Sequence, residues 1–102
     1  MNMQKMMKQA QKMQAEMARA QEEISEMTFE GSAGGGIVTA TAKGDMTISS
    51  VTINPIAIDP EDPEMLSDMV VAAVNSALAG VSEMSSARMS SATAGVNIPG
   101  LM

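Results

Sequence analysis

The sequence predicts a small α+β fold in which two long helices flank a three-stranded antiparallel sheet. Three observations support this prediction. An apolar heptad pattern without Gly or Pro covers residues 2–27, alternating apolar and threonine residues with a turn signal mark residues 37–53, and a second helical apolar stripe follows Pro63. With 102 residues the chain can form one modest core and is too short for two. We expect one domain over residues 1–90 and a tail over residues 91–102.

The first predicted helix, residues 2–27, places apolar residues at alternating spacings of three and four, as coiled coils do. These positions share one helix face, so the row should pack against another helix. Left in water it would expose a line of methionines, and we therefore expect a homodimer of such subunits. The row is called the heptad seam below and consists of Met3, Met6, Ala10, Met13, Met17, Ala20, Ile24 and Met27.

Three short strands are predicted between the helices. In the middle strand, alanine and valine alternate with Thr39 and Thr41, the pattern of a sheet with one face on a core. The next break in the pattern, Lys43-Gly44-Asp45, has the composition of a tight hairpin turn. The predicted strands are residues 28–32, 37–43 and 46–53.

The last of these strands has an irregular pattern. Met46 and Ile48 fall in one phase of the alternation, whereas Val51 and Ile53 fall in the other. A β-bulge would explain the change of phase, and so would a strand that is partly covered on both faces.

The second long helix is predicted over residues 63–89. Asp62 is placed to cap its first turn, Pro63 suits the first helical position, and Glu64 complements the positive end of the helix dipole. Its apolar stripe should lie across the sheet. The chain after about Met89 is mostly Ser, Ala, Thr and Gly, a composition that buries little, so the tail is expected to be mobile.

Charge is distributed very unevenly along the chain, whose net charge is −6. Residues 1–20 carry four cations and one acid, which gives +3. Residues 21–102 carry two cations and eleven acids, which gives −9. An acidic protein is an unusual partner for nucleic acid, but a locally basic helix can still contact phosphates.

The four cations of the first helix lie on one face, away from the heptad seam. Lys5, Lys12 and Arg19 share a heptad column, with Lys8 at the adjacent outer position, and together they span about 20 Å. Such a face is either a phosphate-binding surface or a solvated surface. Composition alone favours the solvated surface, because acids continue the same face toward the end of the helix.

Several classes of function are disfavoured by the composition. The chain contains no His and no Cys, so neither the usual catalytic bases and nucleophiles nor thiolate metal sites are present. We therefore expect no enzyme, no cofactor, no metal and no small-molecule substrate. Phe29 is the only aromatic residue, which argues against single-strand recognition by base stacking. The N-terminus lacks a secretory h-region and no run of about 18 apolar residues occurs, so we expect a soluble cytoplasmic protein without a membrane partner.

Two local patterns have structural rather than ligand-binding interpretations. The glycine-rich segment 31–36 has the glycines of a phosphate loop but lacks its Lys and Ser/Thr, and it precedes a strand, so we interpret it as a flexible turn. The acids of residues 59–64 lack the spacing of a calcium loop and fit helix capping and solvated charge.

Four segments of the chain are informative through their order and spacing. They are Met7-Lys8-Gln9-Ala10-Gln11-Lys12-Met13-Gln14, the glycine-rich loop before Ile37-Val38, Glu64-Met65-Leu66 with Asp68, Val70, Ala72-Ala73, Asn75 and Ala77, and the ending Gly95-Val96-Asn97-Ile98-Pro99-Gly100. None of the segments is specific by itself, but their combination resembles the YbaB/EbfC family of nucleoid-associated proteins, essentially from end to end.

This resemblance implies a bacterial homodimer that projects helices like tweezers and binds double-stranded DNA without an enzymatic step. It also implies a location in the nucleoid and a part in nucleoid organisation and gene regulation. Carried over by position, it assigns phosphate contacts to Lys5, Lys8, Lys12 and Arg19, with Arg88 as a secondary candidate.

The chain departs from the family pattern at three places. Ser49-Ser50 stands where arginines are frequent, Arg88 is the only cation late in the second helix, and Asn54 replaces an aspartate before proline. The missing cations predict weak, salt-sensitive duplex binding with little base specificity.

The heptad seam also allows a function without DNA. A dimeric coiled-coil module could bind another protein through its adaptable methionine surface or its tail. Reversing the charges of Lys8 and Lys12 distinguishes the two hypotheses, because it should abolish duplex binding but leave a protein partner bound.

Overall fold

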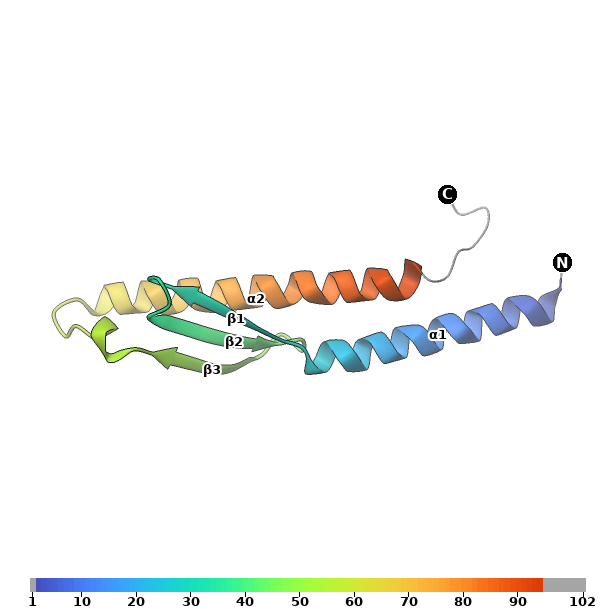
Figure 1. The fold of residues 1–102 in the computed structure, drawn as a ribbon, viewed down its shortest axis with the longest axis horizontal. Coiled ribbons are helices and arrows are strands. Elements are labelled where there is room, and N and C mark those ends of the chain that lie inside the picture. Colours follow the sequence, from blue (N-terminus) through green and yellow to red (C-terminus); the bar gives the residue numbers. More distant parts are fainter. Residues whose placement is uncertain (1, 95–102) are drawn as a thin grey trace.

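The computed structural model describes residues 2–94, which form an elongated molecule of 72 × 24 × 16 Å (Figure 1). Its three strands make one antiparallel sheet in the order β1-β2-β3. The predicted α+β class, with a helix before the sheet and a helix after it, is confirmed. The elements are α1 (Met3–Glu26), β1 (Thr28–Ala33), β2 (Val38–Lys43), β3 (Ile48–Ile53), the 3-10 turn η1 (Pro55–Ala57) and α2 (Pro63–Ala94).

Helix α1 has a defined start and a defined end. The side chain of Asn2 accepts a hydrogen bond from the backbone N–H of Gln4 at 3.0 Å, which caps the first turn. At the other end Met27 adopts an extended backbone, and its N–H donates to the carbonyls of Glu23 and Ile24. Met27 therefore turns the chain directly from α1 into β1.

A β-bulge explains the irregular pattern of β3. Thr41 of β2 pairs with Ser50, but Ala42 pairs with Ile48, so Ser49 is an extra residue in β3. The Ser49 hydroxyl donates to the Thr41 carbonyl at 3.3 Å. The bulge brings Ile48 and Val51 onto the same face of the sheet, although they differ in phase along the sequence.

The hairpin between β2 and β3 confirms the predicted turn at Lys43-Gly44-Asp45. Met46 donates its N–H to the carbonyl of Lys43, and the N–H of Lys43 donates to the carbonyl of Thr47, both at 2.8 Å. Met46 has a φ of +66°, the left-handed conformation that three-residue hairpin loops require. The prediction that the third strand begins at residue 46 is wrong, because Met46 belongs to this turn and pairing starts at Ile48.

The Asp45 carboxylate holds the same turn. It accepts hydrogen bonds from both the hydroxyl and the backbone N–H of Thr47. These bonds stabilise the charged form and lower the pKa of Asp45 below its ordinary value, the hydroxyl contributing most.

Helix α2 begins as predicted. It starts at Pro63, and the Asp62 side chain accepts a hydrogen bond from the N–H of Met65 at 3.2 Å. Its predicted end at residue 89 is wrong, and so is a tail beginning at residue 91, because the helix continues to Ala94. Ala92 is buried there, so tertiary packing supports a segment whose composition alone is a poor guide. The rest of the predicted mobile tail, residues 95–102, lies outside the described residues.

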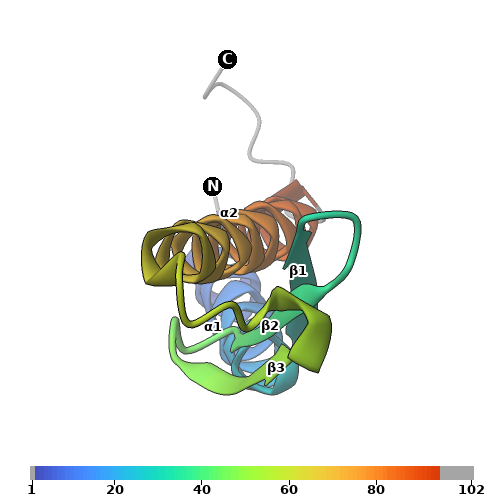
Figure 2. The ribbon, with the colours of Figure 1, turned by 90° about the vertical axis from the view of Figure 1, so that its left-hand side faces the viewer.

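The core lies between α2 and the face of the sheet that α2 covers (Figure 2). Two glycines allow this close packing. A Cβ on Gly31 of β1 would lie 2.3 Å from the backbone nitrogen of Ala77 in α2, and a Cβ on Gly80 would lie 2.1 Å from the ring of Phe29. The fully buried residues of this core are Val38, Ala40, Ala42, Ala57, Ala73, Ala77 and Val81.

By length and composition alone, α2 is also the one helix of residues 2–94 that could cross a membrane. Helices that cover the core of a soluble domain meet the same criterion, and α2 does cover the sheet.

Candidate nucleic-acid interface

Helices α1 and α2 run antiparallel beside each other over only part of their lengths (Figure 1). Arg88 of α2 lies against Glu23 of α1, and the described part of α2 ends at Ala94. The N-terminal part of α1 extends past that end. We call residues 3–16 the arm and residues 17–26 the packed half of α1.

The surroundings of the heptad seam differ between the arm and the packed half of α1. Ala20 is fully buried, and Ile24 is half-buried, in the packed half. On the arm, by contrast, 76% of Met3 and 54% of Met6 are exposed. Met13, near the end of the arm, is half-buried, whereas the seam positions before it are exposed. Within the chain, α2 packs against α1 along the packed half, and packing of the whole seam against another helix stays a prediction.

The arm carries three of the predicted DNA-binding residues. Lys5, Lys8 and Lys12 are exposed, and within residues 2–94 none of them forms an ion pair. Arg19 lies in the packed half and approaches Glu16 one turn away, with 3.7 Å between guanidinium nitrogen and carboxylate oxygen. About two thirds of the Arg19 side chain is exposed, so it can still contact solvent or a ligand.

Arg88, the fifth predicted residue, does not join this group. Its Nε donates a hydrogen bond of 2.5 Å to the Glu23 carboxylate, and only 21% of its side chain is exposed. The hydrogen bond raises the pKa of Arg88 and lowers the pKa of Glu23. The pair links residues 65 positions apart in sequence, and no local pattern around Glu23 indicates it.

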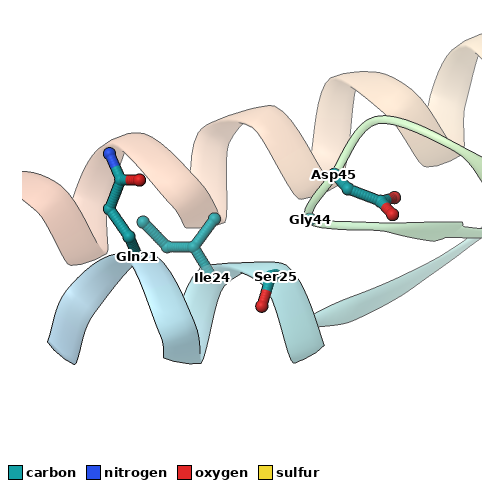
Figure 3. A pocket seen from close by; sticks show the side chains of 5 residues that line it. All are labelled: Gln21, Ile24, Ser25, Gly44 and Asp45. Atoms are coloured by element: carbon teal, nitrogen blue, oxygen red, sulfur yellow. The ribbon is translucent and has the colours of Figure 1, made fainter. Parts of the chain in front are cut away.

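A cavity of about 310 Å³ lies where the packed half of α1 meets the β2–β3 turn (Figure 3). The lining contains one acid and no cation, so it is unsuited to a phosphate. Within residues 2–94 no three His, Cys, Asp or Glu side chains are grouped to hold a metal ion. The cavity is lined by Gln21, Ile24, Ser25, Gly44 and Asp45.

The fold and the arm together define a small α+β protein that presents lysines on a projecting helix, a surface suited to polyanions. Comparison with known proteins narrows this class to one family. A family model described as the YbaB/EbfC DNA-binding family matches residues 1–96. The chain belongs to the YbaB/EbfC family of nucleoid-associated DNA-binding proteins, which is not a family of enzymes.

Curated relatives and a solved structure agree with this assignment. The chain is 49% identical to a nucleoid-associated protein of Alkaliphilus metalliredigens over 98% of its own length and 88% of the relative. It is 53% identical to a nucleoid-associated protein of Pelotomaculum thermopropionicum, covering 98% of this chain and 95% of the relative. The crystal structure of an uncharacterized protein from Helicobacter pylori has the same fold, with a TM-score of 0.68 at 20% identity over 85% of this chain and 91% of that chain.

Proposed function

We propose that this protein acts as a homodimer that binds double-stranded DNA through phosphate contacts of its two arms, with little sequence specificity. In this role it contributes to the organisation of the bacterial nucleoid and to gene regulation. The observation that carries the proposal is the presence of three exposed lysines, free of ion pairs among the described residues, on an arm that projects from an otherwise acidic molecule. They are Lys5, Lys8 and Lys12.

The side chains on the arm favour backbone contact over base reading. Lysine ammonium groups are flexible point charges that bind phosphates without fixing an orientation toward base edges. Phe29, the only aromatic residue of the chain, lies against Gly80, so the protein has no stacking platform. Arg19 adds a further cation in the packed half, close to the arm.

The uncovered seam supports the dimer. Because 76% of Met3 and 54% of Met6 are exposed, a single subunit presents a row of apolar side chains to water. A second copy that packs on this row would bury it and place two basic faces in one assembly. Met6 lies on the seam, away from the lysine face, so both surfaces can be used at once.

Salt dependence provides a quantitative test. Six lysines at phosphates, three from each subunit, give a slope of log affinity against log salt of about −5, or about a thousandfold loss between 50 and 200 mM. We would measure fluorescence anisotropy of a labelled duplex of about 30 base pairs over this range. An unrelated duplex of the same length should bind equally well.

Two charge reversals form a matched pair for the same assay. Lys8→Glu changes a residue of the arm, and Lys43→Glu makes the same change at the end of β2. We expect Lys8→Glu to weaken binding more than about tenfold and Lys43→Glu less than about threefold. Equal losses would mean that only net charge matters. Absence of binding by the unaltered protein at low salt would overturn the DNA proposal and favour a protein-interaction module.

A further inference from the structure

We infer that Glu23 and Arg88 are positioning residues, whose ion pair fixes the direction in which the arm of α1 leaves the subunit and thereby the presentation of its lysines to DNA. This inference rests on the proposed DNA-binding function. It assigns a role to a side-chain pair that joins α1 to α2.

The joint between α1 and the rest of the subunit combines packing against α2 with contacts to the β2–β3 turn. On the backbone side, the N–H of Gly44 donates to the carbonyl of Met27 at 2.9 Å. A Cβ on Gly44 would lie 1.5 Å from the carbonyl oxygen of Ile24, so the β2–β3 turn presses directly against the last turn of α1. The buried Ala20 supplies close apolar packing. These contacts hold the end of α1 in place.

The ion pair is the only side-chain hydrogen bond between α1 and α2 within residues 2–94. The ion pair contacts α1 from the side of α2, whereas the backbone hydrogen bond of Gly44 holds the end of α1 from the β2–β3 turn. The cavity beside Ile24 leaves unfilled space next to the same helical turn, so packing alone does not surround it. The ion pair supplies a directional polar contact at a joint that packing does not fully enclose.

The length of α1 amplifies small changes at the joint. Lys5 lies 18 residues before Glu23, about 27 Å along a helix, so a tilt of about 15° moves it by about 7 Å. The phosphates of one DNA strand advance by about 3.4 Å per nucleotide. A tilt of this size shifts the lysine by about two nucleotides, enough to lose its register with the backbone.

The free energy of unfolding is a poor readout of this role, because ion pairs that solvent can reach contribute little to folding. DNA binding gives a clearer readout, because the electrostatic and the positioning explanations predict opposite changes in affinity. Glu23→Gln removes a negative charge close to the basic arm, so electrostatics alone predicts tighter DNA binding. If Glu23 instead positions the arm, its loss should weaken binding. Glu22→Gln is the matched control, since it makes the same charge change at the neighbouring residue, which forms no ion pair within residues 2–94.

In the anisotropy assay we expect Glu23→Gln to raise the dissociation constant about threefold, while Glu22→Gln leaves it unchanged or lowers it. The charge swap Glu23→Arg with Arg88→Glu keeps the net charge and should restore binding. A Glu23→Gln variant that binds as tightly as Glu22→Gln would overturn the inference.

A second readout needs no DNA. The chain contains no cysteine, so spin labels can be placed uniquely at Gln9→Cys on the arm and Ser67→Cys on α2. Diluting labelled with unlabelled protein confines the measured distances to one subunit. We expect Glu23→Gln, and not Glu22→Gln, to broaden the distance distribution, and an unchanged distribution would refute the positioning role. If the unaltered protein fails to bind DNA, the proposed function fails, and the distances still decide whether the pair orients the arm.

Discussion

Single residues decide how closely the layers of this subunit pack. Gly31 is the clearest case, because its Cα faces the backbone of α2 and leaves no space for a side chain. The sequence placed this glycine both in the first predicted strand, residues 28–32, and in the glycine-rich segment interpreted as a flexible turn, and the structure shows it within β1. The space at Gly31 is needed by Ala77 of α2, which lies 46 residues later in the sequence. The residues around Gly31 therefore give no signal of this need.

The substitution Gly31→Ala tests this packing. The new Cβ would lie 2.3 Å from the Ala77 nitrogen, so α2 must shift, and we expect the free energy of unfolding to fall by about 3 kcal/mol. Urea unfolding followed by circular dichroism measures the change. Ser32→Ala, on the exposed neighbouring position, should change it by less than about 0.5 kcal/mol. Equal stability of the two variants would show that α2 does not approach β1 this closely.

At the scale of elements, the sequence predicted helices and strands well where the signal is local. The capping of α2 by Asp62 and the turn at Lys43-Gly44-Asp45 both follow from short-range chemistry. The bulge at Ser49 was one of two alternatives, because the alternation of a single strand cannot show how its neighbour is registered. The end of α2 was placed too early, because the support for Ala92 is tertiary packing.

The β2–β3 turn provides a pH-dependent test at this scale. The Thr47 hydroxyl is the main cause of the lowered pKa of Asp45, so Thr47→Val should raise that pKa toward its ordinary value. The pKa of Asp45 is lower in the folded than in the unfolded state. Asp45 therefore stabilises the fold at a pH above its unfolded-state pKa, and this stabilisation is lost as the pH falls through its folded-state pKa. Carboxyl carbon NMR titration measures both variants. Thr52→Val on β3 is the control, and an equal shift there would contradict this account.

For the whole molecule, heptad spacing identified the apolar face of α1 but not its partner. Ala20 packs within the chain, whereas Met6 is left exposed, and nothing in the spacing distinguishes the two. The candidate site was likewise predicted only in part. The lysines of the arm could be named from charge clustering, but the ion pair of Arg88 with Glu23 could not, because it depends on how two distant helices are brought together.

The proposed dimer gives the prediction at this scale. Met6→Lys puts a charge on the exposed seam without disturbing the contacts of α2, so we expect a folded subunit that no longer dimerises. Sedimentation equilibrium measures the mass, and circular dichroism checks the fold. Gln11→Lys adds the same charge on the other side of the arm and should remain dimeric. A dimer that persists in Met6→Lys would place the interface elsewhere.

The partial overlap of α1 with α2 also has a consequence for how the arm becomes ordered. A 14-residue helix is marginal by itself in water, because its first turn is costly to form. Here the packed half supplies that first turn as a preformed nucleus, and the arm needs only to propagate from it, one hydrogen bond per residue. Fraying should therefore begin at Met3 and diminish toward Met17. The protein can thus keep an extended helix in solution, shaped in advance for its ligand, without enclosing it in a core.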